Sequence, residues 1–287
     1  MYVQFEHLRP ATLPDLLTIL EQKPEHAMFL GGGTDMLVDL RARKLSPTHL
    51  IDVKNIPQFH EITESETVVR IGCAATLSQI AADPLVLEWV PALAQGTDKV
   101  GCTQIRNKGT LAGNIQTASP AGDGLNAACA LDANVVLLSP KGERRMPVCD
   151  YVCGPRRTRL GEKEFLAYIE LPKRRWSFQQ FFKVGLRNAL AISVVNGVVA
   201  VELENGIVKD ARLSCGAVGP TPLRITAAED LLLNRPLTDE RIKMAARSVT
   251  DSVHPISDLR ASAEYRAYMA GVMVKRQLEM CREVCTK

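Results

Sequence analysis

The sequence has no long apolar run and no concentration of basic residues. Its 287 residues carry 35 Lys and Arg against 32 Asp and Glu, a formal net charge of +3, and the excess is not gathered into the stripe that phosphate-backbone binding needs. The longest apolar stretch, Ala189–Leu203, is interrupted by Asn196 and Glu202 and is shorter than the roughly 20 residues that cross a bilayer. We therefore expect no nucleic-acid partner and no membrane span, and we interpret this stretch as a buried strand.

Targeting and metal-binding signals are also missing. Charged residues and a proline interrupt the N-terminal region between Glu6 and Pro10, so we expect neither a signal peptide nor a transit sequence, and a cytoplasmic location. The eight cysteines should then be reduced thiols, most of them small core fillers. The pairs Cys149/Cys153 and Cys281/Cys285 lack the spacing of zinc ligands, and we predict no metal site.

Composition and length indicate a folded chain of two or three lobes. Apolar residues make up 46% and charged residues 23% of the sequence, which are ordinary globular values. We place a first lobe at 1–56, a second at 57–175 and a third at 176–287. The fold class that we expect is α+β.

Alternating helix and strand signals run through the first two lobes. Thr12 can cap a helix, residues 27–32 are expected to form a buried strand, and a second helix should place Met36, Leu37 and Leu40 on one face. A strand ending near residue 53 completes a β-α-β opening. The second lobe is predicted to have a hairpin at 62–73, a helix ended by Pro84, and strands at 133–139, 144–152 and 163–172.

The third lobe has the pattern of an antiparallel meander followed by helices. Strand signals occur at 178–187, 192–203 and 207–219, with an Asn-Gly turn before the last of them. Apolar residues then recur at helical spacing in 227–233, 239–249 and 263–284. We expect a sheet covered by helices.

A glycine-rich loop, Phe29–Asp35, follows a predicted strand and opens a predicted helix. Bare backbone N–H groups and the positive end of a helix can hold a phosphate in this position. The alternative is a plain turn in which Thr34 or Asp35 caps the helix. The loop is neither a P-loop, since no Gly-Lys-Ser/Thr follows it, nor the dinucleotide fingerprint G-x-G-x-x-G.

A second segment, Thr110–Asp123, supplies glycine and short polar side chains in what we interpret as one loop. It could hold a polar ligand, or it could be an irregular connection that satisfies its own carbonyl groups. The two loops lie about eighty residues apart in the sequence. Together they suggest a ligand longer than one phosphate, such as a dinucleotide with a pyrophosphate centre.

Four motifs carry a resemblance to a known family. The segments Phe29–Asp35, Gln104–Ile115, Ala118–Asp123 and Phe181–Arg187 resemble the FAD-binding medium subunit of the molybdenum hydroxylases, among them xanthine dehydrogenase, nicotinate dehydrogenase, 4-hydroxybenzoyl-CoA reductase and carbon monoxide dehydrogenase. The match covers nearly the whole chain. It implies a two-lobe FAD-binding domain of the vanillyl-alcohol-oxidase (PCMH) type, followed by a C-terminal lobe of antiparallel sheet plus helices.

The resemblance also implies which residues hold the cofactor. The glycine loop would wrap the FAD pyrophosphate, so Gly32 and Gly33 should tolerate no bulky side chain. Asp123 would receive a hydroxyl or N–H, and Lys183 would lie near the isoalloxazine and stabilise a reduced anionic flavin. The full predicted set is Phe29, Leu30, Gly31, Gly32, Gly33, Thr34, Asp35, Met36, Val100, Thr110, Leu111, Ala112, Gly113, Asn114, Thr117, Asp123, Leu166 and Lys183.

The function that the resemblance implies is electron transfer. The FAD would accept electrons from 2Fe-2S clusters on a small partner subunit, which take them from a molybdopterin site on a large subunit, and would pass them to NAD+ or another acceptor in a dimer of heterotrimers. Many relatives carry an acidic residue just after Arg187, where this chain has Asn188–Ala191, so the acceptor stays open. No cluster-carrying insertion is visible, and Cys102, Cys149 and Cys153 are interpreted as structural.

Two other functions remain open. One is a self-contained flavin oxidoreductase of the vanillyl-alcohol-oxidase class, which would need its own substrate pocket and a general base. The other is a FAD-free scaffold subunit. We would expect the sequence of such a subunit to have lost the glycine loop.

Overall fold

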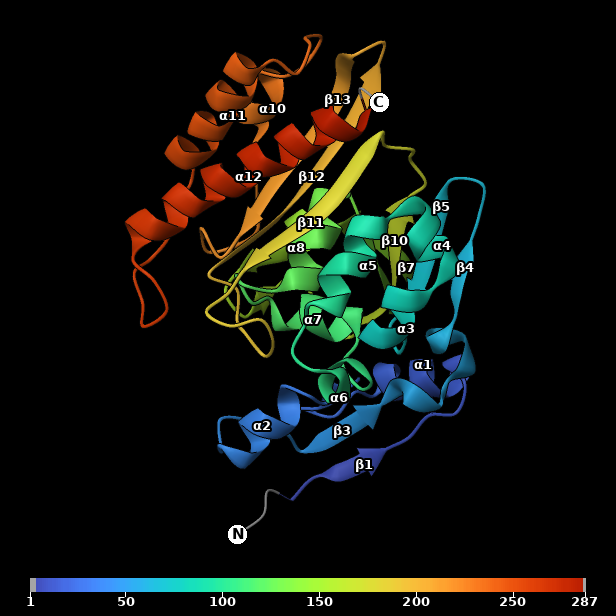
Figure 1. Cartoon of the computed structure of the whole chain (residues 1–287). Helices are drawn as coiled ribbons and strands as arrows, with labels where there is room; N and C mark the ends of the chain where they lie inside the picture. The colour runs from blue at the N-terminus through green and yellow to red at the C-terminus, as the bar shows by residue number, and fades with distance from the viewer. Residues whose placement is uncertain (1–3, 286–287) are drawn as a thin grey trace.

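The described residues fold into three larger sheets, one after another along the chain, and one two-stranded pair, with helices packed between and around them (Figure 1). The computed structural model describes residues 4–285; residues 1–3 and 286–287, which belong to the predicted lobes 1–56 and 176–287, lie outside the described residues. The first sheet is parallel, in the order β1-β3-β2. Its elements are β1 (Glu6–Leu8), α1 (Leu13–Glu21), β2 (Met28–Leu30), α2 (Met36–Arg41) and β3 (His49–Asp52).

The predicted β-α-β opening is confirmed, with two differences. Thr12 caps α1 through a capping box with Asp15. On α2, however, only Leu40 of the predicted apolar face is buried, while Leu37 is 46% exposed. The helix has only six residues, and only its last turn packs against the core. Strand β2 is half-buried rather than buried, because it lies at the edge of its sheet.

The second lobe is an antiparallel sheet in the order β4-β5-β10-β6-β7 with helices on one side. Its strands are β4 (Ile62–Glu64), β5 (Val68–Gly72), β6 (Asn134–Ser139), β7 (Gly142–Pro147) and β10 (Phe165–Pro172), with a small β8 (Val152–Gly154) and β9 (Arg157–Thr158) pair. The short helix η1 (Val53–Asn55) ends the first lobe. The helices of the second lobe are η2 (Pro57–His60), α3 (Leu77–Ala82), α4 (Pro84–Trp89), α5 (Pro91–Asp98), α6 (Thr103–Arg106), α7 (Leu111–Thr117), α8 (Asp123–Ala130) and α9 (Val148–Tyr151).

Two boundaries in this lobe differ from expectation. The helix α3 ends at Ala82, before Pro84 as predicted, but Pro84 also begins a further helix, α4, because proline is well placed in the first turn of a helix. The strand expected at 144–152 ends at Pro147 and continues as the short helix α9.

The segment Thr110–Asp123 is not one loop, and that prediction is wrong. The Thr110 side chain accepts a hydrogen bond from the N–H of Gly113 and caps α7, and Asp123 is the first residue of α8. Leu111 and Ile115 are both fully buried. Burial of these apolar side chains outweighs the weak helix propensity of the glycine and asparagine between them.

The third lobe confirms the predicted meander. An antiparallel sheet runs in the order β11-β12-β13-β14, and α12 crosses β12 while α5 and α8 contact the sheet as well. The helix α8 therefore links the second lobe to the third. The elements are β11 (Phe178–Val184), β12 (Val195–Glu204), β13 (Ile207–Gly216), β14 (Leu223–Arg224), α10 (Thr226–Asp230), α11 (Asp239–Ser252) and α12 (Ala263–Cys285).

Four of the eight cysteines are buried in the core. The buried ones are Cys73, Cys129, Cys215 and Cys281, while Cys102 is half-buried and Cys149, Cys153 and Cys285 are exposed. The expectation that most of them fill the core is therefore wrong. Within residues 4–285, no group of three or more His, Cys, Asp or Glu side chains is arranged to hold a metal ion. None of the helices in this range has the length and apolar character needed to cross a bilayer.

Candidate functional site

A cavity of about 560 Å³ lies between the glycine loop of the first lobe and the Thr110 segment of the second. It brings together two parts of the sequence that were predicted to act on one ligand. Most of the predicted site residues line it: Phe29, Leu30, Gly31, Gly32, Gly33, Thr34, Asp35, Met36, Val100, Thr110, Gly113, Asn114 and Thr117.

The glycine loop packs directly on the backbone of Lys108 and Gly109. A Cβ added to Gly32 would lie 2.1 Å from the carbonyl oxygen of Lys108 and 2.7 Å from the Cα of Gly109. Gly33 has a φ of +72°, which favours glycine. Gly32 is therefore required by a contact within the chain, and the expectation that ligand approach alone excludes a side chain there needs correction.

The other side of the loop is held by a hydrogen bond between the two motifs. The Thr117 hydroxyl donates to a carboxylate oxygen of Asp35 at 2.9 Å. Asp35 occupies the N-cap position of α2 but makes no side-chain capping bond, which removes support for the plain-turn alternative. The carboxylate of Asp35 instead joins α2 to the C-terminal turn of α7.

Backbone donors in the loop are available to a ligand. Among the described residues, no hydrogen bond uses the N–H groups of Gly32, Gly33 or Thr34. Backbone N–H groups that face a cavity without a protein acceptor are suited to a phosphate oxygen. Since α2 has only six residues, these donors, rather than a helix dipole, are the feature of the loop that suits an anion.

A smaller apolar cavity of about 80 Å³ adjoins the large one and shares Phe29, Gly31, Thr110, Gly113 and Gln116 with it. Two more predicted residues, Ala112 and Leu166, line this branch. The rings of Phe29 and Phe165 meet there, with centroids 4.9 Å apart. The site thus combines a polar loop with an apolar recess, which is the combination that a ligand with an anionic centre and aromatic rings requires.

Sequence reasoning missed several wall residues. Gly109 and Ile105 fall inside the motif Gln104–Ile115, so the sequence could have indicated that they line the cavity. Arg156 and Asp39 gave no signal, because they come from distant segments and are joined only in the fold, at 2.9 Å. The lining residues outside the predicted set are Met28, Asp39, Leu45, Leu77, Gly101, Ile105, Gly109, Gln116 and Arg156 in the large cavity.

Three predicted residues lie outside both cavity walls. Leu111 is fully buried in the core. Asp123 is 5% exposed and accepts hydrogen bonds from Ser193 and Asn196, both at 2.6 Å. Lys183 forms an ion pair with Asp123 and donates to the carbonyl oxygen of Lys99 at 2.8 Å. Asp123 was expected to receive a hydroxyl or an N–H as part of the cofactor site, and the donors that the structure gives it all come from the protein.

The arrangement of lobes and site is typical of a protein that binds a dinucleotide cofactor between two lobes. Residues 3–174 match the family model described as the FAD binding domain in molybdopterin dehydrogenase, and residues 180–281 match the CO dehydrogenase flavoprotein C-terminal domain. The chain belongs to this family of FAD-binding medium subunits of the molybdenum hydroxylases, as its motifs predicted.

Individual relatives cover nearly the whole chain. The FAD-subunit of nicotinate dehydrogenase from Eubacterium barkeri is 34% identical over 268 residues, 91% of this chain and 90% of that protein. The putative xanthine dehydrogenase FAD-binding subunit of Escherichia coli K12 is 32% identical over 271 residues, 93% and 92% of the two chains. The carbon monoxide dehydrogenase structure from Hydrogenophaga pseudoflava matches with a TM-score of 0.93 at 30% identity over 99% of both chains, which confirms the predicted fold.

Proposed function

We propose that this chain holds FAD in the cavity between its first two lobes and serves as the electron-transfer subunit of a molybdenum-dependent hydroxylase. The N–H groups of Gly32, Gly33 and Thr34 would bind the pyrophosphate, and the recess at Phe29 and Leu166 would take an aromatic ring of the cofactor. When bound, FAD supplies the capacity to accept and release electrons.

The unpaired donors of the glycine loop carry this proposal. A hydrogen bond from a backbone N–H to a charged phosphate oxygen contributes about 1.5–3 kcal/mol. The loop is also held in place before any ligand arrives, by the Gly32 contact with Lys108 and by the hydrogen bond between Thr117 and Asp35. A preorganised site loses less entropy on binding.

The partners that we propose rest on the resemblance to the family, and the names of the relatives support part of them. These are called FAD-subunits and medium chains, and one related structure is described as a carbon monoxide dehydrogenase that lacks the Mo-pyranopterin moiety of the molybdenum cofactor. We therefore propose a small subunit with 2Fe-2S clusters, a large subunit with molybdopterin, NAD+ or another acceptor, and a dimer of heterotrimers. The cytoplasmic location stays a prediction.

Substitution of Gly31 tests FAD binding with little risk to the fold. A Cβ at Gly31 would meet only the Thr110 hydroxyl oxygen, at 3.4 Å, so Gly31→Val should place its methyl groups in the cavity. We expect Gly31→Val to fold with the circular dichroism spectrum of the wild type but to purify without flavin. Flavin at the wild-type stoichiometry would contradict the assignment.

Two further variants separate binding from folding. Gly219 lies outside the cavity, and a Cβ there would meet just one atom, the Thr221 carbonyl oxygen at 3.7 Å. Gly219→Val should therefore keep both fold and flavin. Gly32→Val should lose the fold itself, because its Cβ would overlap the Lys108 carbonyl, so loss of flavin in that variant says nothing about the ligand.

Affinity purification from the native cells tests the proposed complex. A flavin spectrum, iron, molybdenum and two co-purifying chains would support the electron-transfer subunit. A single yellow protein without metals would favour the self-contained flavin oxidoreductase. A colourless protein would favour the FAD-free scaffold.

A further inference from the structure

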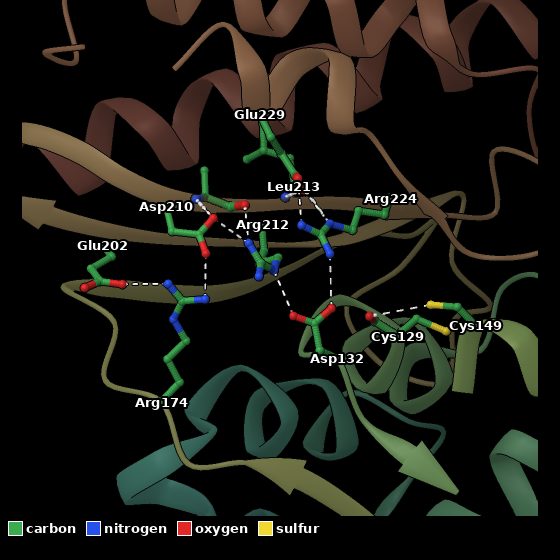
Figure 2. Close-up of polar contacts among 11 residues, drawn as sticks. Cys129, Asp132, Cys149, Arg174, Glu202, Asp210, Arg212, Leu213, Arg224 and Glu229 are labelled. Carbon is green, nitrogen blue, oxygen red and sulfur yellow. Dashed lines mark hydrogen bonds and ion pairs between the residues drawn. The ribbon is translucent and has the colours of Figure 1, made fainter. Parts of the chain in front are cut away.

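Two thiols meet at the surface of the second lobe, away from the cavity. Cys149 is exposed in α9, and Cys129 is 4% exposed near the end of α8. The Cys149 sulfur lies 3.7 Å from the carbonyl oxygen of Cys129, toward which its thiol can donate. Figure 2 shows the Cys149 sulfur directed at the Cys129 carbonyl oxygen.

The surroundings give the two thiols different character. A hydrogen bond from the Cys129 thiol lowers the pKa of Cys149, a nearby Arg224 acts in the same direction, and burial, Asp132 and Asp150 oppose it. The hydrogen bond with Cys149 and burial raise the pKa of Cys129 well above its usual value. The exposed thiol is thus the readier nucleophile, and the buried thiol stays protonated beside it.

We propose that Cys149 is an oxidation site that reacts with hydrogen peroxide and then forms a disulfide with Cys129. The Cys149 thiolate attacks one peroxide oxygen, the O–O bond breaks, and hydroxide leaves, which takes up a proton to become water. The Cys129 sulfur then attacks the sulfenic acid sulfur of Cys149 and displaces a second water. Two thiols and one peroxide give one disulfide and two waters, so the thiols lose two electrons and the peroxide gains them.

The place of the pair in the fold gives the disulfide a structural consequence. The Cys129 carbonyl oxygen also accepts a hydrogen bond from the N–H of Asp132, and Asp132 binds Arg212 and Arg224 of the third lobe (Figure 2). A covalent bond would therefore fix α9 to the end of α8 where the second lobe meets the third. It would also close a loop between positions 20 apart in the sequence, which restricts the unfolded chain.

Cys153 is the matched control for Cys149. It is exposed as well and lies on the next element, β8, and no hydrogen bond joins its side chain to another thiol among the described residues. If exposure alone decided reactivity, both cysteines would react with iodoacetamide at similar rates. The proposal requires Cys149 to react several-fold faster than Cys153.

The experiment uses the full chain, treated with stoichiometric hydrogen peroxide and digested without reduction. We expect a peptide pair linked through Cys129 and Cys149, and a higher Tm for oxidised than for reduced protein. Both effects should persist in Cys153→Ser and disappear in Cys149→Ser. In Cys129→Ser treated with excess peroxide, Cys149 should advance to sulfinic acid, a step that consumes a second peroxide, because no thiol remains to resolve the sulfenic acid.

Three results would overturn the proposal: equal alkylation rates at Cys149 and Cys153, sulfinic acid at Cys149 in the wild type without a linked peptide, or a linked peptide that leaves Tm unchanged. Each readout is independent of flavin content. Failure of the FAD assignment would therefore leave this test unaffected.

Discussion

The ammonium group of Lys183 lies 2.5 Å from a carboxylate oxygen of Asp123, so two residues that were expected to serve the cofactor are bound to each other. Asp123 begins α8 in the second lobe and Lys183 lies on β11 in the third. The pair is one of the links between these lobes. Through the bond from Lys183 to the Lys99 carbonyl, it also supports the chain just before Val100, which lines the cavity.

Removing the positive member of this pair should destabilise the protein. In Lys183→Met the Asp123 carboxylate stays buried and loses its counter-charge, which costs about 3 kcal/mol of unfolding free energy. Urea unfolding of the apoprotein measures this. The double variant Asp123→Asn/Lys183→Met should recover part of the loss, and a single variant as stable as the wild type would show that the pair has no structural role.

A network of ion pairs at the same junction allows a comparison of buried and exposed carboxylates (Figure 2). Glu229 is 4% exposed; it accepts from the backbone N–H of Leu213 at 2.8 Å and pairs with Arg224 at 2.9 Å. Glu229→Ala leaves both donors without this acceptor and should cost about 3 kcal/mol in urea unfolding.

The matched variant is Asp132→Asn, because Asp132 has a φ of +55°, which asparagine tolerates and alanine does not. The Asp132 side chain is 44% exposed, although it pairs with both Arg212 and Arg224. Water screens such a pair, and the loss should stay below about 1 kcal/mol. Equal losses in Glu229→Ala and Asp132→Asn would show that burial does not set the strength of these contacts.

The hydrogen bond between Thr117 and Asp35 should contribute to FAD affinity. In Thr117→Val the glycine loop loses one tie to α7, worth about 1 kcal/mol, which corresponds to a roughly fivefold higher Kd for FAD. Titration of the apoprotein with FAD, followed by flavin fluorescence, measures this change. Thr117→Ser keeps the hydroxyl and should bind like the wild type; an equal loss in both variants would assign the effect to packing.

The sequence was informative about the cavity because glycine and short polar residues mark it locally. The position of the loop at Phe29–Asp35 could be predicted from its place between a strand and a helix. The same composition led to the wrong prediction of one loop at Thr110–Asp123. The helix α7 contains glycine and asparagine, but the burial of Leu111 and Ile115 stabilises it. Tertiary packing, which no short window of sequence reports, decided the conformation there.

Contacts between residues far apart in the sequence were the second feature of the site that could not be predicted. Arg156 lines the cavity from a tight turn where its φ is +57°, and no motif surrounds it. The resemblance indicated that Asp123 and Lys183 belong to the cofactor site, but it could not indicate that they bind each other. Residue identity can be carried over from a motif, whereas the partner of each side chain depends on the packing of separate lobes.

Tyr151 provides a test of the fold by pH. Its side chain is fully buried and its hydroxyl donates to Gln116, a cavity residue. Burial disfavours the tyrosinate and raises the pKa of Tyr151 from 10.0 to about 12. Since the unfolded chain releases this proton first, the stabilisation is complete below pH 10 and is lost as pH rises to about 12. Urea unfolding across this range should therefore show a steeper fall for the wild type than for Tyr151→Phe; parallel curves would place the hydroxyl in contact with water.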